Sequence, residues 1–150
     1  MKLAIGSDHN GLGLKQVIAE HLQDRPDVEL RDFGTHTPDP VDYPDIAREL
    51  AEAVSRGDCD RGILICGTGL GMDIAANKVR GIRATVCHDV YSAERSRKSN
   101  NAHIMTMGAL IVGSELAKKL VDVWLESEFQ GGRSAPKVAK IMEIEQAHSS

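Results

Sequence analysis

The pattern of hydrophobic residues most limits the fold that this chain can adopt. Short apolar runs alternate along the chain with segments in which apolar residues recur every three or four positions, as on one face of a helix. About six such strand-then-helix alternations follow one another without repeats or low-complexity linkers. Strands that alternate with helices form parallel sheets whose two faces are covered by helices. The pattern therefore predicts a doubly wound α/β fold, a Rossmann-like three-layer αβα arrangement.

The expected elements can be placed by residue. The helix that begins near Asp42 has the clearest start signal, because Asp42 is a favoured N-cap, Pro44 fits the first turn, and Asp45 complements the helix dipole. Strands are predicted over residues 2–7, 28–33, 61–66, 81–87 and 103–108, and helices over 14–22, 42–54, 72–78, 89–98 and 116–124.

Length and composition exclude several classes of protein. The 150 residues fit one domain, which we expect to span residues 1–150, and the content of 41% hydrophobic and 27% charged residues is typical of globular proteins. A formal charge of −4 argues against a nucleic-acid or anionic-membrane binder, because neutralising phosphates requires a clustered basic surface. The chain has no long apolar run, and its three cysteines form no C-x-x-C pair. We therefore expect a soluble, cytoplasmic protein.

The stretch "GILICGTGLGMDIAANK" (residues 62–78) carries the strongest local signal. A buried strand ends at Cys66, and Gly67, Gly69 and Gly71 follow before a helical segment begins. In open parallel sheets, ligands bind beyond the carboxyl ends of the strands. Glycines let the backbone approach a ligand closely, and the free N–H groups at the start of a helix attract negative charge. The stretch therefore predicts an anion-binding loop beside a cysteine.

Other motifs with similar chemistry do not fit the spacing. A dinucleotide-binding G-x-G-x-x-G that starts at Gly67 would need glycine at Met72, and a C-x5-R phosphatase loop would need arginine at the same position. No Gly-Lys-Ser/Thr sequence is present, and the six histidines show no H-x3-H or Cys/His pairing. The sequence thus predicts neither a cofactor nor a metal.

A cysteine beside such a loop can act as a base. A thiolate can remove a proton from a carbon next to a carbonyl when preorganised donors stabilise the enediolate oxygen. A nearby helix amino terminus favours the thiolate form of a cysteine. Taken alone, a buried cysteine at a strand end is more often a small hydrophobic residue. The adjoining glycine loop favours the catalytic interpretation for Cys66.

Six motifs in this order and spacing resemble one family over nearly the whole chain. They are "GSDHNG", "DYPD", "GILICGTGLGMDIAANK", "GIRA", "YSAERSRKSNNAHIMTMG" and "GGRS". Together they resemble the ribose-5-phosphate isomerase type B family, within the wider LacAB-like sugar-phosphate isomerases. The resemblance implies a metal-independent aldose–ketose isomerase of a phosphorylated sugar. It also implies a homodimer or dimer of dimers with sites at the subunit interface.

The resemblance also assigns roles to particular residues. It implies that Cys66 shuttles the proton between C1 and C2, and that Thr68 and the loop amides support it and hold the enediolate. A phosphate needs donors and positive charge, which His9 and Arg133 can supply. The remaining substrate-binding positions that the resemblance implies are Asp8, Tyr43, Gly67, Gly69, Gly71, Asn100 and Lys137.

Each of these residues also has a purely structural interpretation. Asp8 can cap a turn, Tyr43 can pack ahead of Pro44, Asn100 can close a turn, and Arg133 can be a solvated surface residue. His103 opens an apolar run and fits a strand end better than a catalytic role.

Three positions depart from the family pattern. Ser99 stands where the family has a histidine thought to open the furanose ring, and Leu110 and Lys137 stand where it has arginines. Erythrose 4-phosphate cannot close a furanose ring and needs no such histidine. The resemblance favours a ribose 5-phosphate isomerase, and the three departures leave open a tetrose-phosphate isomerase, ring opening by His103 or water, or a non-catalytic sugar-phosphate sensor.

Overall fold

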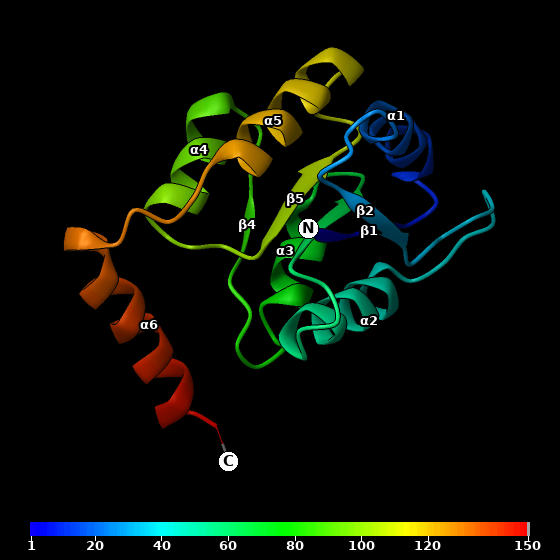
Figure 1. The fold of residues 1–150 in the computed structure, drawn as a ribbon. Helices are drawn as coiled ribbons and strands as arrows, with labels where there is room; N and C mark the ends of the chain where they lie inside the picture. The colour runs from blue at the N-terminus through cyan, green and yellow to red at the C-terminus, as the bar shows by residue number, and fades with distance from the viewer. Residues whose placement is uncertain (150) are drawn as a thin grey trace.

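An all-parallel sheet runs through the middle of the molecule in the computed structural model, which describes residues 1–149 (Figure 1). Within these residues the sheet has five strands in the order β2-β1-β3-β5-β4. The strands are β1 (Lys2–Ser7), β2 (Glu29–Asp32), β3 (Arg61–Cys66), β4 (Ala84–Val86) and β5 (Ile104–Gly108).

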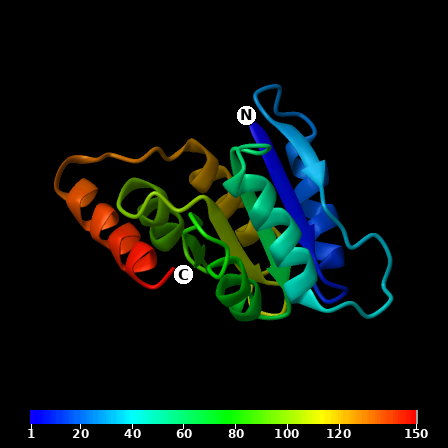
Figure 2. The same ribbon diagram turned by 90° about the horizontal axis from the view of Figure 1, so that it is seen from below.

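Helices cover both faces of the sheet (Figure 2). Helices α1 and α5 pack on one face, and α4 lies beside α5; α2 and α3 pack on the other face. The helices are α1 (Leu12–Leu22), α2 (Tyr43–Ser55), α3 (Leu70–Ala76), α4 (Val90–Lys98), α5 (Ser114–Glu126) and α6 (Ala135–Ala147), with a short 3₁₀ turn, η1, at Gly132–Ser134.

Two hydrophobic cores form because side chains alternate along each strand. On β3, Ile63 and Ile65 point into the core shared with α1 and α5. Leu64 and Cys66 point into the core shared with α2 and α3. Cys66 is therefore on the face that α2 and α3 cover, which decides the residues that surround its thiol.

The predicted alternation is confirmed, and the five strands placed from the sequence are the five strands found among residues 1–149, although the alternations number five and not about six. The expected strand at 81–87 is shortened to Ala84–Val86, and the expected helix at 72–78 begins two residues earlier, at Leu70. Asp42 occupies the N-cap of α2 as predicted, but its side chain accepts no capping hydrogen bond. Asp89, by contrast, caps α4 by accepting a hydrogen bond from the Ser92 amide.

Helix α6 is absent from the elements predicted from sequence. Val138 is its one buried residue, while Ile141 and Ile144 are exposed, so the helix shows little of the one-sided pattern that reveals a packed helix. Figures 1 and 2 place α6 at the margin of the molecule, on the side of β4 and α4. Its contacts include hydrogen bonds from Gly81 to Glu145 and from Arg83 to Met142.

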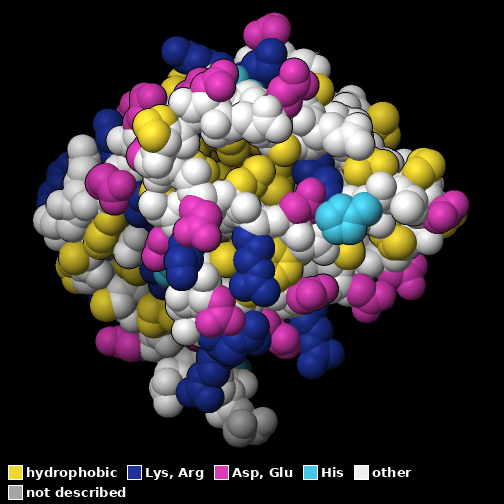
Figure 3. Space-filling view, turned by 45° about the vertical axis from the view of Figure 1, so that its right-hand side comes forward, with side chains coloured by type: hydrophobic (Ala, Val, Ile, Leu, Met, Phe, Trp, Pro, Cys, Tyr) yellow, Lys and Arg dark blue, Asp and Glu magenta, His cyan; other side chains and the backbone are white. Residues whose placement is uncertain are grey.

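The surface carries both acidic and basic side chains (Figure 3), as expected from the 22 acidic and 18 basic residues of the sequence. Acidic and basic side chains are interspersed over the face in Figure 3, with exposed hydrophobic side chains between them. None of the helices within residues 1–149 is both long and apolar enough to cross a membrane.

Candidate active site

The predicted site lies where the winding of the sheet reverses. From β1 the chain crosses to β2 on one side and then returns to β3 on the other, so the loops after β1 and β3 diverge at the carboxyl edge. Ligands of open α/β sheets bind at such a switch point. Ser7 pairs with Ile65 in the ladder, and therefore Asp8 and Cys66 follow side by side on adjacent strands.

The Cys66 thiol lies against the backbone of the glycine loop. Its Sγ accepts a hydrogen bond from the Gly69 amide at 3.1 Å. The amides of Thr68 and Gly71 donate to no group among residues 1–149, so both are available to an anion. Cys66 is only 5% exposed within one chain. The sulfur is thus almost fully enclosed at the end of β3, where the sequence placed it.

Gly69 sets the shape of this loop. Its φ of +79° is left-handed, a conformation that glycine adopts without strain. A Cβ at this position would lie 2.7 Å from the Met107 carbonyl carbon, because the loop rests on the end of β5. The Thr106 hydroxyl on β5 donates a hydrogen bond to the Gly69 carbonyl at 2.9 Å and so attaches the loop to this strand. Strand β5 therefore holds the amide that contacts Cys66.

Asp8 and His9 occupy the loop after β1. Asp8 is buried, and its Oδ1 accepts a hydrogen bond from the Gly11 amide at 3.0 Å, which is the turn-capping role considered from sequence. Its Oδ2 has no protein partner among residues 1–149, so one carboxylate oxygen can accept a ligand hydroxyl. The Nδ1 atom of His9 accepts a hydrogen bond from the Val41 amide at 3.2 Å, which orients the ring.

Tyr43 reaches the same edge from the start of α2. A Cβ built at Gly71 would lie 2.4 Å from the Tyr43 ring, so the absence of a side chain there lets the ring pack on the start of α3. The structure thus brings together the residues predicted on β1, α2 and β3. They are Asp8, His9, Tyr43, Cys66, Gly67, Thr68, Gly69 and Gly71.

The other predicted binding residues lie at the opposite edge of the sheet. The Asn100 carbonyl accepts a hydrogen bond from the Nε atom of Arg83, directly ahead of β4. Cys66, in contrast, is level with Gly108 at the carboxyl end of β5. Arg133 in η1 and Lys137 in α6 are both exposed, and helix α6 lies on the α4 side of the molecule (Figure 1). One chain therefore does not join these three residues to Cys66.

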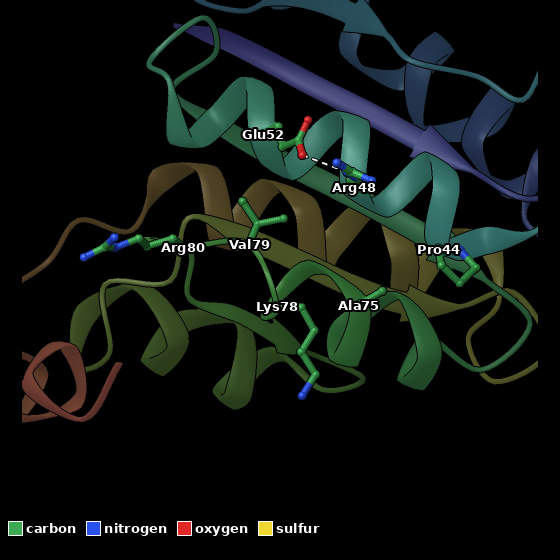
Figure 4. Close-up of a pocket in the computed structure, with 7 residues that line it drawn as sticks. All are labelled: Pro44, Arg48, Glu52, Ala75, Lys78, Val79 and Arg80. Carbon is green, nitrogen blue, oxygen red and sulfur yellow. Dashed lines mark hydrogen bonds and ion pairs between the residues drawn. The ribbon is translucent and has the colours of Figure 1, made fainter. Parts of the chain in front are cut away.

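A cavity beside α2 contains no residue of either group. It has a volume of about 500 Å³ and lies between α2 and the end of α3 (Figure 4). Arg48 is paired with Glu52 at 2.9 Å, and the Lys78 and Arg80 side chains point away from each other. Because its cations do not converge, this groove has no evident anion site.

A smaller cavity adjoins the second group. Its volume is about 290 Å³, and it lies between β4 and α4. Its lining includes Asn100 and the side chain of Arg95. This is the cavity that contains a residue from the predicted substrate-binding set.

Three residues outside the predicted set organise the site. Besides Thr106, the His88 Nε2 accepts a hydrogen bond from the Gly108 amide at 3.0 Å. Asn77, in the quoted "AANK", accepts from the Ala84 amide and donates to the Ala84 carbonyl, each at 2.8 Å. Asn77 thereby ties α3 to the edge strand β4. No spacing rule applied to the sequence indicates these long-range contacts.

Burial and neighbouring arginines alter the acid–base behaviour of one histidine. Burial, and then the nearby Arg83, Arg97 and Arg61, lower the pKa of His103 to about 4. Its Nδ1 accepts a hydrogen bond from the Arg83 amide. His103 is therefore neutral near pH 7 and lies at the amino end of β5, which gives no support to ring opening by this residue.

The other two cysteines are also buried. Burial raises the pKa of both Cys59 and Cys87, which keeps these thiols protonated. All three cysteines are free. Among residues 1–149, no group of three or more His, Cys, Asp or Glu side chains is arranged to hold a metal ion.

These features define a class of protein: an α/β protein whose topological switch point holds a thiol, a carboxylate and unpaired amides. The family model described as Ribose/Galactose Isomerase matches residues 3–141. The chain belongs to this family and is therefore an enzyme of the isomerase class.

Individual relatives cover almost the whole chain. The chain is 56% identical to the Ribose-5-P isomerase B of Listeria innocua, over 97% of this chain and 98% of that one. It is 50% identical to the D-erythrulose-4-phosphate isomerase of Pectobacterium atrosepticum, over 94% and 93% of the two chains. The solved Ribose-5-Phosphate Isomerase B of Clostridium thermocellum superposes with a TM-score of 0.97 at 56% identity, covering 99% of this chain and 100% of that one.

Proposed function

We propose that this enzyme interconverts ribose 5-phosphate and ribulose 5-phosphate by proton transfer through an enediolate, without a metal or cofactor. The observation that carries the proposal is the contact between the Cys66 thiol and the Gly69 amide, next to the Asp8 carboxylate. Two relatives named as ribose 5-phosphate isomerases, each 56% identical to this chain, support the choice of substrate.

In this mechanism the Cys66 thiolate takes the proton from C2 of the open-chain aldose. The C–H electron pair forms the C1–C2 double bond, and negative charge develops on the C1 oxygen. The unpaired amides of Thr68 and Gly71 stabilise this oxygen, as preorganised donors do in other enolising sites. The thiol then returns the proton to C1, and the proton on the C2 hydroxyl is transferred to the C1 oxygen. The free Oδ2 of Asp8 is placed to accept a substrate hydroxyl.

The phosphate requires positive charge that one chain does not place beside Cys66. We propose that a second copy supplies Asn100, Arg133 and Lys137, so that the site forms at the interface of a homodimer or dimer of dimers. Exposed apolar side chains near the loop support such an interface, because contiguous apolar surface often marks association. They are Leu70, Ile74, Leu110 and Ile111.

A mixing experiment tests the shared site. Cys66→Ala and Arg133→Ala chains are each expected to be inactive alone. After denaturation and joint refolding, half of the dimers are mixed, and each mixed dimer has one intact site, so about one quarter of the wild-type activity returns. If the mixture stays inactive although mixed dimers form, the two residues do not act in a shared site.

A tetrose phosphate is the second candidate substrate. The Ser99 hydroxyl accepts two hydrogen bonds from Arg95 and cannot replace a histidine as an acid or base at neutral pH. A relative named as an erythrulose-4-phosphate isomerase supports this alternative.

Because the three cysteines are free and the charge is negative, we place the enzyme in the cytoplasm, as a small-molecule enzyme without nucleic-acid or membrane partners.

A substrate panel tests the proposal. Initial rates are measured with four-, five- and six-carbon aldose phosphates for the wild type and Cys66→Ala. We expect the highest kcat/KM with ribose 5-phosphate, and loss of turnover in Cys66→Ala with substrate binding retained. A far higher kcat/KM with erythrose 4-phosphate would assign the tetrose reaction instead. Binding without turnover by the wild-type protein would indicate a sensor.

A further inference from the structure

The cavity between β4 and α4 contains a cation that no predicted role explains. The Arg95 side chain on α4 is 33% exposed, and Arg95 lines this cavity together with Asn100. Residues that carry hydroxyl groups are also part of the lining. Its remaining lining residues are Thr85, Val86, Cys87, Tyr91, Ser92 and Ser96.

The Arg95 guanidinium is held by neutral acceptors. Its Nε and Nη2 donate to the Ser99 hydroxyl at 2.9 and 2.6 Å, and Nη2 also donates to Gln130 at 3.4 Å. Its one ion pair among residues 1–149, with Glu94, is long at 3.9 Å, and Glu94 also pairs with Lys98 at 3.6 Å. The charge of Arg95 is therefore oriented but weakly neutralised, which suits an anionic ligand.

Arg95 also lies on the helix that precedes Asn100, one of the residues proposed to bind the substrate. The Gln130 amide donates to the Lys98 carbonyl at 3.1 Å, so the segment that leads to Arg133 is attached to the end of α4. Asn100 follows the same helix and lines the same cavity. Arg95 and Asn100 therefore line one cavity, and the segment that leads to Arg133 is attached to the end of the same helix.

We propose that Arg95 binds the anionic end of the substrate and that Ser99 is a positioning residue for its guanidinium. The inference rests on the proposed function and deepens it. At Leu110, where the family has an arginine, this chain has an apolar side chain, and Arg95 supplies positive charge from a different element. This role of Ser99 needs no acid–base chemistry, because its hydroxyl only has to accept the two hydrogen bonds from the guanidinium.

The test compares kinetics and phosphate binding in matched variants. Arg95→Gln removes the charge, and Ser99→Ala removes the acceptor while Ser99→Thr keeps it. Arg56→Gln is the control, because it removes one arginine from an exposed pair with Asp58 outside the site. For each, kcat and KM are measured with the best substrate, together with competition by inorganic phosphate. Calorimetric titration with inorganic phosphate provides a readout that does not depend on turnover.

For Arg95→Gln we expect KM and the phosphate inhibition constant to rise together by roughly 10–100-fold, the usual effect of losing hydrogen bonds to a charged group, with kcat nearly unchanged. Ser99→Ala should show a smaller rise in KM, and Ser99→Thr should restore the wild-type value. If KM and phosphate binding in Arg95→Gln match those of Arg56→Gln, the inference is wrong. A global loss of folding would lower kcat and the melting temperature instead of changing KM alone.

The two proposals fail in different ways. If turnover depends on Cys66 and Arg95→Gln has an unchanged KM, the proposed function stands and the role of Arg95 is refuted. If no aldose phosphate is isomerised, the proposed function fails, and the titration with inorganic phosphate still decides whether Arg95 binds an anion.

Discussion

Replacing Gly69 with alanine should strongly destabilise the loop that holds Cys66. A non-glycine residue in the left-handed conformation costs about 1–2 kcal/mol, and the φ of +79° requires it. The new Cβ would lie 2.7 Å from the Met107 carbonyl carbon, which is sheet backbone and cannot move as a side chain can. Overpacking of this kind costs about 1–3 kcal/mol. We expect Gly69→Ala to lower the free energy of unfolding by about 2–5 kcal/mol.

The matched control is Gly57→Ala. Gly57 has a similar φ of +84°, but nothing lies within 4 Å of the position that its Cβ would take, so only the conformational cost of about 1–2 kcal/mol applies. Urea unfolding can be followed by the fluorescence of Trp124, the single tryptophan, which is fully buried. Turnover should be lost in Gly69→Ala and retained in Gly57→Ala. Equal destabilisation of the two variants, with activity retained in both, would refute this account of the loop.

Three further predictions concern residues outside the catalytic loop. The pKa of His103, lowered to about 4, means that the unfolded chain binds more protons between pH 6.5 and 4, so stability should fall as the pH drops through this range. His103→Asn should remove about 1–2 kcal/mol of the difference between the unfolding free energies at pH 7 and pH 5. Lys15→Met removes the buried ammonium that bonds Asp32 at 2.7 Å and the Thr35 carbonyl at 2.6 Å, and should cost about 1–3 kcal/mol in urea unfolding; an unchanged midpoint would contradict this. Asn77→Leu should accelerate amide hydrogen exchange in β4 while leaving β1 protected, because both Ala84 bonds are lost.

The sequence was sufficient to predict the elements whose hydrophobic periods are matched by burial. Strand β3 and the start of α2 follow the predictions closely, because each has an unbroken apolar face and clear start signals. Helix α6 escaped prediction because a single chain buries only Val138 of it. Its exposed apolar residues are explained if part of its packing partner is another chain.

The site was predictable only in part for a related reason. Residues at the ends of neighbouring strands, such as Asp8 and Cys66, are placed together by the topology alone. Thr106 and His88 act through hydrogen bonds to backbone atoms far away in the sequence, and no local pattern marks them. The hydrogen bond from Arg95 to Ser99 likewise becomes evident only from the geometry of α4.

Solvent exchange at the reacting carbon tests the role of Cys66 most directly. Ribose 5-phosphate is incubated in deuterated water with the wild type, Cys66→Ala and the buried control Cys59→Ala, and deuterium at C1 and C2 is followed by NMR. The account predicts incorporation with the wild type and Cys59→Ala, and none above background with Cys66→Ala. Incorporation at the wild-type rate in Cys66→Ala would show that another group moves the proton.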